Sequence, residues 1–202
     1  MKTRSIFYSL LFATSAFTLL SSCSGDKKQD HEAHDAKVVA EPDNLRVIAP
    51  QFEVDDTFRK QLEGVFINYV ALKEALVASD AEKTQQKASE TSQALADADM
   101  TLLSGAAHND WMQYLSEMEQ SLNTIKSESE IETQREAFST LSDNLYKSIK
   151  AFGLAGSTAY YEYCPMAFDD KGAYWLSDAS KIRNPYFGDK MLSCGEVKEK
   201  LQ

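Results

Sequence analysis

Four sulfur-containing side chains near the end of the chain have the types and spacing of a soft-metal site. They form two Cys–Met pairs, Cys164-Pro165-Met166 and Met191-Leu192-Ser193-Cys194, within a segment rich in aromatic and turn residues. Thiolate and thioether sulfurs are soft ligands, and a thioether suits Cu(I) better than Zn(II). The side chains of Cys164, Met166, Met191 and Cys194 are therefore the candidate ligands of one Cu(I) ion.

The same two cysteines are also the expected partners of a single disulfide bond. The chain has three cysteines, and Cys23 is assigned below to a lipid anchor, which leaves Cys164 and Cys194. In an oxidising compartment such a pair commonly forms a bridge, and this one would stabilise the fold by about 3 kcal/mol. Met166 and Met191 would then be packing residues. Both interpretations stay open, because a disulfide could be the oxidised, metal-free form of the same site.

Two short strands and two turns are expected to bring the Cys–Met pairs together. Residues 157–164 and 172–177 are aromatic and favour β-structure, and the residues from Asp169 to Gly172 between them favour a tight turn. A second turn is predicted at residues 184–188, Asn-Pro-Tyr-Phe-Gly. The C-terminal segment, about 157–202, is thus expected to form a small β-hairpin, a loop and a short terminal helix.

The local sequence around each cysteine supports specific placements of the sulfur atoms. Pro165 favours an extended Cys164, which would put Cys164 and Met166 on the same side of a strand. The terminal helix is expected to start at Asp189 or near Cys194 and to end at Lys200. A helix starting near Cys194 would favour its thiolate through the helix dipole.

Residues 51–202 are predicted to form a mainly helical domain, an up-and-down four-helix bundle that carries the C-terminal segment. Apolar residues recur at helical spacing in four stretches of about 20 residues joined by short turns. The stripes include Phe58 to Leu76, Ala88 to Leu102, Trp111 to Ile125, and Phe138 to Phe152. Expected start signals are an Asp55 or Asp56 cap and capping boxes at Ser79 with Glu82 and Ser129 with Glu132, and expected stop signals are Gly105, Gly153 and Gly156.

No combination of residues in the helices has the spacing of an enzyme active site. The sequence lacks the H-E-x-x-H and G-x-S-x-G motifs and the Glu-x-x-His pairs of di-iron bundles. His108, just before Trp111, is the one histidine in the helical region, and a lone histidine near a helix start is usually a cap or a surface residue. We therefore expect a protein that is not an enzyme.

The N-terminus has the features of a lipoprotein signal peptide. Lys2 and Arg4 precede an uncharged apolar stretch that ends at Leu20-Ser21-Ser22-Cys23. An aliphatic residue and two small residues before a cysteine are typical of a signal that is cleaved after residue 22. Cys23 would then carry the lipid, so that the protein is anchored to the membrane without spanning it. The expected location is the cell envelope, periplasmic or associated with the outer membrane.

The residues after Cys23 are expected to form a flexible tether, and the whole chain is acidic. Residues 23–50 are polar and of mixed charge, with too few apolar residues to form a core. The chain has a formal net charge of −10, and loss of residues 1–22 would make it about −12. A negative surface repels phosphates, so nucleic acid is not an expected partner.

The C-terminal motifs resemble those of a domain of unknown function. They comprise Cys164-Pro165-Met166-Ala167, Asn184-Pro185-Tyr186-Phe187-Gly188 and Met191-Leu192-Ser193-Cys194-Gly195, and the resemblance extends over most of residues 55–200. Such domains form the body of small secreted lipoproteins and are fused to periplasmic adaptor subunits of copper/silver efflux pumps. The resemblance implies that the chain handles a heavy metal, with copper expected, and that its partner is a heavy-metal efflux adaptor or pump.

Tyr163-Cys164-Pro165-Met166 is also similar to the core of a short heavy-metal-binding module, Tyr-x-Cys-Pro-Met-His. In this chain Ala167 occupies the place of the histidine. A metal site would therefore use sulfur alone or take a nitrogen ligand from elsewhere, and His108 is the candidate. The resulting hypothesis is an envelope lipoprotein that binds Cu(I) for sequestration or transfer to an efflux system. The alternative is a disulfide-stapled helical interaction module with no metal role.

Overall fold

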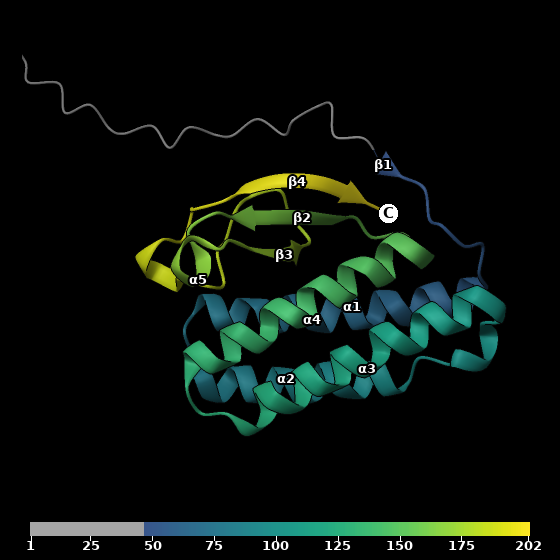
Figure 1. Cartoon of the computed structure of the whole chain (residues 1–202), viewed down its shortest axis with the longest axis horizontal. Coiled ribbons are helices and arrows are strands. Elements are labelled where there is room, and N and C mark those ends of the chain that lie inside the picture. The colour runs from purple at the N-terminus through teal and green to yellow at the C-terminus, as the bar shows by residue number, and fades with distance from the viewer. Residues whose placement is uncertain (1–46) are drawn as a thin grey trace, which may run out of the picture. The chain divides into compact units, whose positions relative to one another are not determined.

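The computed structural model describes residues 47–202, and the predicted signal peptide (1–22), Cys23 and residues 24–46 lie outside the described residues. Four main helices are followed by a small sheet (Figure 1). The helices are α1 (Asp56–Val77), α2 (Ala81–Ala96), α3 (Gly105–Ser127) and α4 (Ile131–Phe152). Consecutive helices pack against each other in pairs. The prediction of a mainly helical domain with four amphipathic helices is confirmed.

The helix boundaries follow from capping and from glycine. Asp55 caps α1, since its carboxylate accepts a hydrogen bond of 2.7 Å from the Thr57 N–H. Gly153 ends α4 at φ +76°, a conformation that glycine adopts without strain. The second helix is shorter than expected: α2 ends at Ala96, and a 3₁₀ turn, η1 (Met100–Leu102), precedes α3.

Both predicted capping boxes are wrong. Asp80 caps α2 through a 3.0 Å hydrogen bond from the Lys83 N–H, while Ser79 lies one residue earlier with φ +54°. The residue before α4 is Glu130, whose side chain makes no capping bond. Aspartate and serine are equally good N-cap residues, so the local sequence does not determine whether residue 79 or residue 80 caps α2. Tertiary contacts of Ser79 decide it.

The core of the helical region is built from the four apolar stripes. Phe58 packs edge-on against Trp111 and Phe152, with ring centroids 5.1 and 5.3 Å away, so that α1, α3 and α4 meet at one end. Tyr69 stacks on Phe138 at 5.0 Å nearer the sheet. All five rings are fully buried. No helix among residues 47–202 is long and apolar enough to cross a membrane.

The C-terminal segment forms a mixed sheet with the strand order β1-β4-β2-β3. Its strands are β1 (Val47–Ile48), β2 (Ala159–Cys164), β3 (Ala173–Ser177) and β4 (Glu196–Leu201). Strands β2 and β3 are antiparallel, with Tyr161 opposite Leu176 and Glu162 opposite Trp175, which confirms the expected hairpin. Figure 1 shows the sheet beside α1 and α4.

The tight turn of the hairpin has an unusual backbone. Phe168, Asp169 and Asp170 within α5 (Ala167–Asp170) have φ between +53° and +62°. Each left-handed residue other than glycine costs about 1–2 kcal/mol. Gly172 follows at φ +79°, and a Cβ there would lie 2.2 Å from the Tyr163 hydroxyl. The sequence indicated the turn at residues 169–172, but not this left-handed run.

The predicted terminal helix is wrong, because Glu196–Leu201 form strand β4. This strand pairs antiparallel with β2, so that Tyr163 faces Glu196, and parallel with β1, so that Ile48 faces Leu201. The 3₁₀ turn η2 (Gly188–Lys190) is the helical turn that precedes it. Val47 and Ile48 were expected to lie in the tether, but they extend the sheet at its edge.

Candidate functional site

The thiols of Cys164 and Cys194 are neighbours at one end of the sheet. Cys164 is the last residue of β2, and Cys194 comes two residues before β4, the strand that pairs with β2. Their Sγ atoms are 3.3 Å apart, and both thiols are free. Cys164 is fully buried and Cys194 is partly exposed. The pair therefore has one open side, through which an ion or an oxidant could reach it.

The electrostatic surroundings of the pair differ from those expected from the sequence. Burial and the neighbouring Cys164 thiol raise the pKa of Cys194 above its ordinary value. No helix dipole opposes this effect, because β4 replaces the expected helix. Cys194 is therefore a protonated thiol at neutral pH, and a metal or an oxidant must displace its proton.

The two methionines lie near the cysteines along the chain but differ in placement. Strand β2 ends at Cys164, so Met166 falls in the turn that follows, with φ −91° and ψ −5°, and not on the same strand face. Its side chain is 45 % exposed. Met191 directly follows η2, and its carbonyl accepts a 3.0 Å hydrogen bond from the Cys194 N–H.

His108 lies at the opposite end of the helical bundle from the thiols. It is in the first turn of α3, close to Trp111, which packs on Phe152 at the end of α4. The loop that carries Cys194 packs instead on Arg135, near the start of α4. The part of α4 from Arg135 to Phe152 is about 25 Å long. The structure does not bring His108 to the cysteines, and residues 47–202 contain no group of three or more His, Cys, Asp or Glu placed to hold a metal.

Residues 178–195, which we call the covering loop, connect β3 to β4 and lie over the sheet. A Cβ at Gly195 would be 2.8 Å from the indole of Trp175, and Tyr186 packs edge-on against the same indole at 5.9 Å. The predicted turn is present, since the Gly188 N–H donates to the Asn184 carbonyl at 3.2 Å. The covering loop thus covers the thiol pair on one side and places Cys194 next to Cys164.

Asn184 holds the covering loop together from inside. Its side-chain amide donates a 2.8 Å hydrogen bond to the Cys194 carbonyl, and its side-chain oxygen accepts one of 2.8 Å from the Tyr186 N–H. Its own backbone N–H donates to the Leu192 carbonyl at 2.9 Å. Asn184 is fully buried, so these bonds do not compete with water.

Arg135 attaches the covering loop to the helices. Its Nε donates to the Pro185 carbonyl at 2.8 Å. Its Nη2 donates to the Ser79 hydroxyl at 2.9 Å and to the Leu76 carbonyl at 3.3 Å. These contacts explain the left-handed backbone of Ser79, because its hydroxyl accepts a hydrogen bond from Arg135 and does not cap α2. One buried guanidinium therefore joins α4, the end of α1 and the covering loop.

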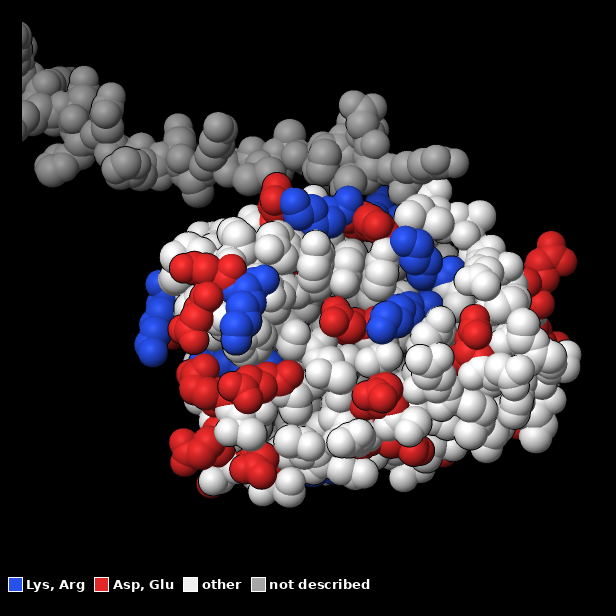
Figure 2. All heavy atoms as spheres, viewed as in Figure 1, with Lys and Arg blue, Asp and Glu red and all other residues white. Residues whose placement is uncertain are grey.

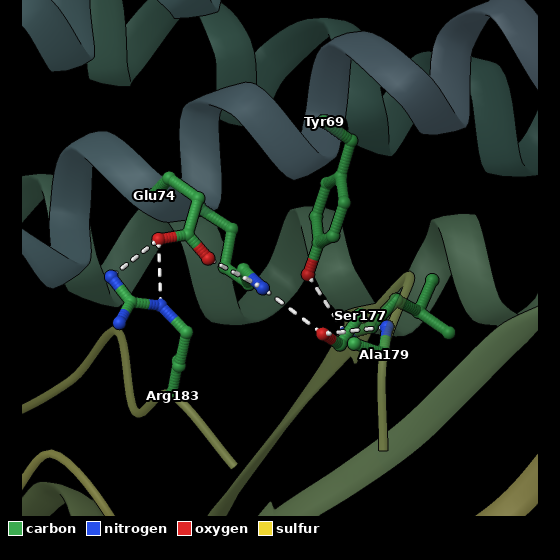
Figure 3. A network of polar contacts seen from close by, with 7 residues as sticks. Tyr69, Glu74, Ser177, Ala179 and Arg183 are labelled. Carbon is green, nitrogen blue, oxygen red and sulfur yellow. Dashed lines mark hydrogen bonds and ion pairs between the residues drawn. The ribbon is translucent and has the colours of Figure 1, made fainter. Parts of the chain in front are cut away.

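A second polar network ties α1 to the sheet and to the covering loop (Figure 3). Lys73 is buried, and its Nζ donates to the Ser177 hydroxyl at 3.0 Å and lies 2.9 Å from Glu74. Glu74 also pairs with Arg183 of the covering loop at 2.8 Å. Tyr69 accepts a 3.1 Å hydrogen bond from the Leu176 N–H. The covering loop is thus held at two places, by Glu74 and by Arg135.

Glu162, on the same strand as Cys164, is a buried carboxylate without a hydrogen-bond partner. Neither of its oxygens is paired in the part of the chain that the structure describes, and the same is true of the Nε1 of Trp175 across the strand pair. Burial raises the pKa of Glu162 to about 8, although the nearby charge of Lys73 and the proximity of the Trp175 indole N–H both act in the opposite direction. Glu162 therefore keeps its proton at neutral pH.

Among residues 47–202, the remaining charged residues do not mark a second site. On the face shown in Figure 2, several basic side chains lie beside acidic ones, and no continuous basic surface is visible. Lys150 and Tyr146 of α4 contact Glu199 of β4 at 3.4 and 2.7 Å, which joins the helix to the sheet. Such partly exposed pairs contribute little to the free energy of unfolding. Their main effect here is to join α4 to β4.

Sequence reasoning missed Arg135, Asn184 and Glu162 as parts of the site. Arg135 looks like one more charge on a helix, and Glu162 like an exposed position on a hairpin. Asn184 was noted as a turn residue and as part of the motif that carries the family resemblance, but not as a residue that contacts Cys194. For Glu162 the signal was alternation, because Glu162 and Cys164 are two apart on one strand and must lie on the same side of the sheet.

Comparison with known proteins gives one match. Residues 65–157 match a family described as a protein of unknown function, DUF3347. The matched region runs from the middle of α1 to just before β2, so it does not include the thiol pair. No curated protein and no solved structure matches the chain. A domain of unknown function is thus confirmed over residues 65–157.

Proposed function

We propose that this chain is an envelope lipoprotein that binds one soft metal ion, Cu(I), between Cys164 and Cys194. The ion would be cargo, held for sequestration or for transfer to a heavy-metal efflux adaptor or pump. The observation that carries the proposal is the pair of free thiols, whose sulfur atoms lie 3.3 Å apart with one side open. No catalytic activity is part of the proposal.

The donor set favours a soft ion that accepts few ligands. Two sulfurs each about 2.3 Å from one ion, the usual Zn–S distance, can be at most about 4.6 Å apart. The pair at 3.3 Å needs only a small movement of Cys194, the more exposed partner, to admit an ion. Two thiolates with one Cu(I) leave a single negative charge, and sulfur ligands suit Cu(I) better than harder ions.

The methionines serve as secondary donors in this proposal. Met166 is exposed beside Cys164, and Met191 lies in the covering loop three residues before Cys194. Either thioether could approach an ion on the open side of the pair by rotation about its side-chain bonds. His108 is left out of the site, because it lies at the other end of the bundle.

Reduced protein should take up about one Cu(I), and loss of either thiol should nearly abolish the uptake. The measurement is competition with a chromophoric Cu(I) chelator under anaerobic conditions. Cys164→Ser and Cys194→Ser each remove one of two ligands, whereas Met166→Leu and Met191→Leu should weaken binding much less, since they conserve volume and leave the thiolates. His108→Ala is the matched control and should bind as wild type does. Equal Cu(I) uptake by wild type and the double Cys→Ser variant would refute the proposal.

A disulfide-stapled module with no metal role is the second candidate function. The 3.3 Å separation of the sulfur atoms favours it as well, because a bond of about 2.05 Å could form with little backbone movement. In this case the covering loop would be fixed to β2 by a covalent bond. Thiol titration of protein isolated from the envelope, with and without added copper, separates the two candidates. A complete bridge that copper and mild reductant leave intact would favour the staple.

The lipid anchor is part of the proposal and concerns residues outside the described part of the chain. It is supported by the signal sequence that ends at Leu20-Ser21-Ser22-Cys23. We expect Cys23→Ala to leave no mature protein in the detergent phase after phase separation of cell extracts. Partition of the variant into detergent at the mature size would contradict the assignment. Cys194→Ser, which keeps the signal intact, is the control and should partition as wild type does.

A further inference from the structure

We propose that Asn184 is the positioning residue of the thiol pair, presetting Cys194 against Cys164 before any ion or oxidant arrives. This inference deepens the proposed function, because it concerns the same pair, but it holds for metal binding and for disulfide formation alike. Asn184 touches neither sulfur. It acts through the backbone of Cys194, to which its side-chain amide donates a 2.8 Å hydrogen bond.

A continuous series of contacts connects α4 to Cys194 and Cys164. Arg135 of α4 donates to the Pro185 carbonyl at 2.8 Å, and Asn184 is the preceding residue. Asn184 then binds the Cys194 carbonyl, and the Cys194 sulfur lies 3.3 Å from that of Cys164 on β2. The contacts thus begin at α4 and end at β2, so the position of Cys194 is restrained from both elements.

The burial of Asn184 strengthens its hold on Cys194. It is fully buried, and both ends of its side-chain amide are used, one by Cys194 and one by the Tyr186 N–H. A buried hydrogen bond of this kind stabilises by about 1 kcal/mol, and more is lost when one partner stays unpaired. The hydrogen bond from Asn184 therefore restricts the movement of the covering loop at Cys194, where the loop has no regular structure and is partly exposed.

Presetting raises the effective concentration of one thiol at the other. In disulfide formation with oxidised glutathione, two protein thiols lose two electrons and two protons, and one oxidised glutathione becomes two glutathione molecules. The equilibrium constant of this exchange measures how favourably the folded chain holds its sulfurs together. Ligation of one ion by both thiolates depends on the same arrangement.

The test compares variants of the full mature protein in glutathione buffers of defined ratio. Asn184→Asp keeps an acceptor for the Tyr186 N–H but cannot donate to the Cys194 carbonyl, and Asn184→Ala removes both bonds. Each should lower the equilibrium constant for the bridge about tenfold, which corresponds to about 30 mV. Tyr186→Phe is the matched control, because it removes the loop's hydrogen bond to the Tyr174 carbonyl and leaves the Asn184 bonds in place. It should lower thermal stability and leave the equilibrium constant within about twofold.

A measurement without substitutions covers the case in which the Asn184 variants do not fold. The side-chain amide protons of Asn184 should exchange slowly with solvent in the reduced, metal-free protein, as observed by NMR, because the bond to Cys194 exists before the pair reacts. Fast exchange in that state would overturn the inference. So would an unchanged equilibrium constant in folded Asn184 variants, or an equal loss in Tyr186→Phe. If wild type binds no Cu(I) but the equilibrium constants follow the prediction, the proposed function fails and the role of Asn184 stands.

Discussion

Replacing Glu162 with glutamine is expected to increase the free energy of unfolding relative to wild type. This increase should be about 3 kcal/mol larger at pH 8 than at pH 5. Burial raises the pKa of this carboxyl from 4.5 to about 8. The unfolded chain therefore loses the proton above pH 4.5, while the folded chain keeps it until about pH 8. In this window the folded state binds more protons, so wild type loses stability as the pH rises. Glutamine does not titrate, and the variant escapes this loss.

Urea unfolding at the two pH values, with linear extrapolation, measures the difference. Groups around Glu162 that also carry charge are Lys73, which opposes the shift, and Asp178 and Glu74, which add to it. They remain in the variant, so their own effects appear in both proteins. Glu196→Gln on the neighbouring strand, where the side chain is exposed, is the control and should change stability equally at both pH values. An equal effect of Glu162→Gln at pH 5 and pH 8 would show that Glu162 is ionised in the fold.

Replacing Arg135 with methionine is expected to destabilise the domain by about 2 kcal/mol and to free the covering loop. Methionine fills a similar volume but leaves the Pro185 carbonyl, the Leu76 carbonyl and the Ser79 hydroxyl without the donor that binds them. The buried Pro185 carbonyl loses its donor, which costs about 1–3 kcal/mol. The Leu76 carbonyl still accepts from the Ser79 N–H, and Ser79 is exposed to water, so these two groups add little. Urea unfolding gives the loss of stability, and the rate of Cys194 alkylation in the folded state should rise because its loop is no longer held.

Glu132→Gln is the matched control for Arg135. Glu132 contacts the same guanidinium at 2.7 Å, but its side chain is 69 % exposed, so the pair is screened by water. Its loss should leave both stability and alkylation close to wild type. A stable Arg135→Met variant with an unchanged alkylation rate would mean that the covering loop is held mainly by Glu74 and Arg183.

The helical part of the fold was predictable because its signals are local. Apolar spacing places Phe58, Trp111 and Phe138 on the inner faces of their helices, and all three are buried. The strand β4 was not predictable in this way. Val197 and Leu201 are four residues apart, which suits a helix, and the pairing with β2 and β1 makes the segment extended. Long-range pairing overrides local preference in such a segment.

For the candidate site, the sequence indicated which residues approach each other but not how they are held. The turns at residues 169–172 and 184–188 predicted that Cys164 and Cys194 would meet, and their sulfurs lie 3.3 Å apart. The roles of Arg135 and Asn184 depend on contacts with residues far away in the chain or across an irregular loop. No periodicity marks such contacts, so neither the burial of Arg135 nor the bond from Asn184 to Cys194 could be predicted.

The two tryptophans lie in different regions of the domain, so their fluorescence can report on the two regions separately. Trp111 lies among Phe58 and Phe152 at the end of the bundle remote from the thiols, and Trp175 lies beneath the covering loop. With Trp111 replaced by phenylalanine, all indole fluorescence would come from beneath that loop. The molecule then carries its own optical probe of the covering loop, because any lifting of Gly195 or Tyr186 exposes Trp175 to water and to dissolved quenchers.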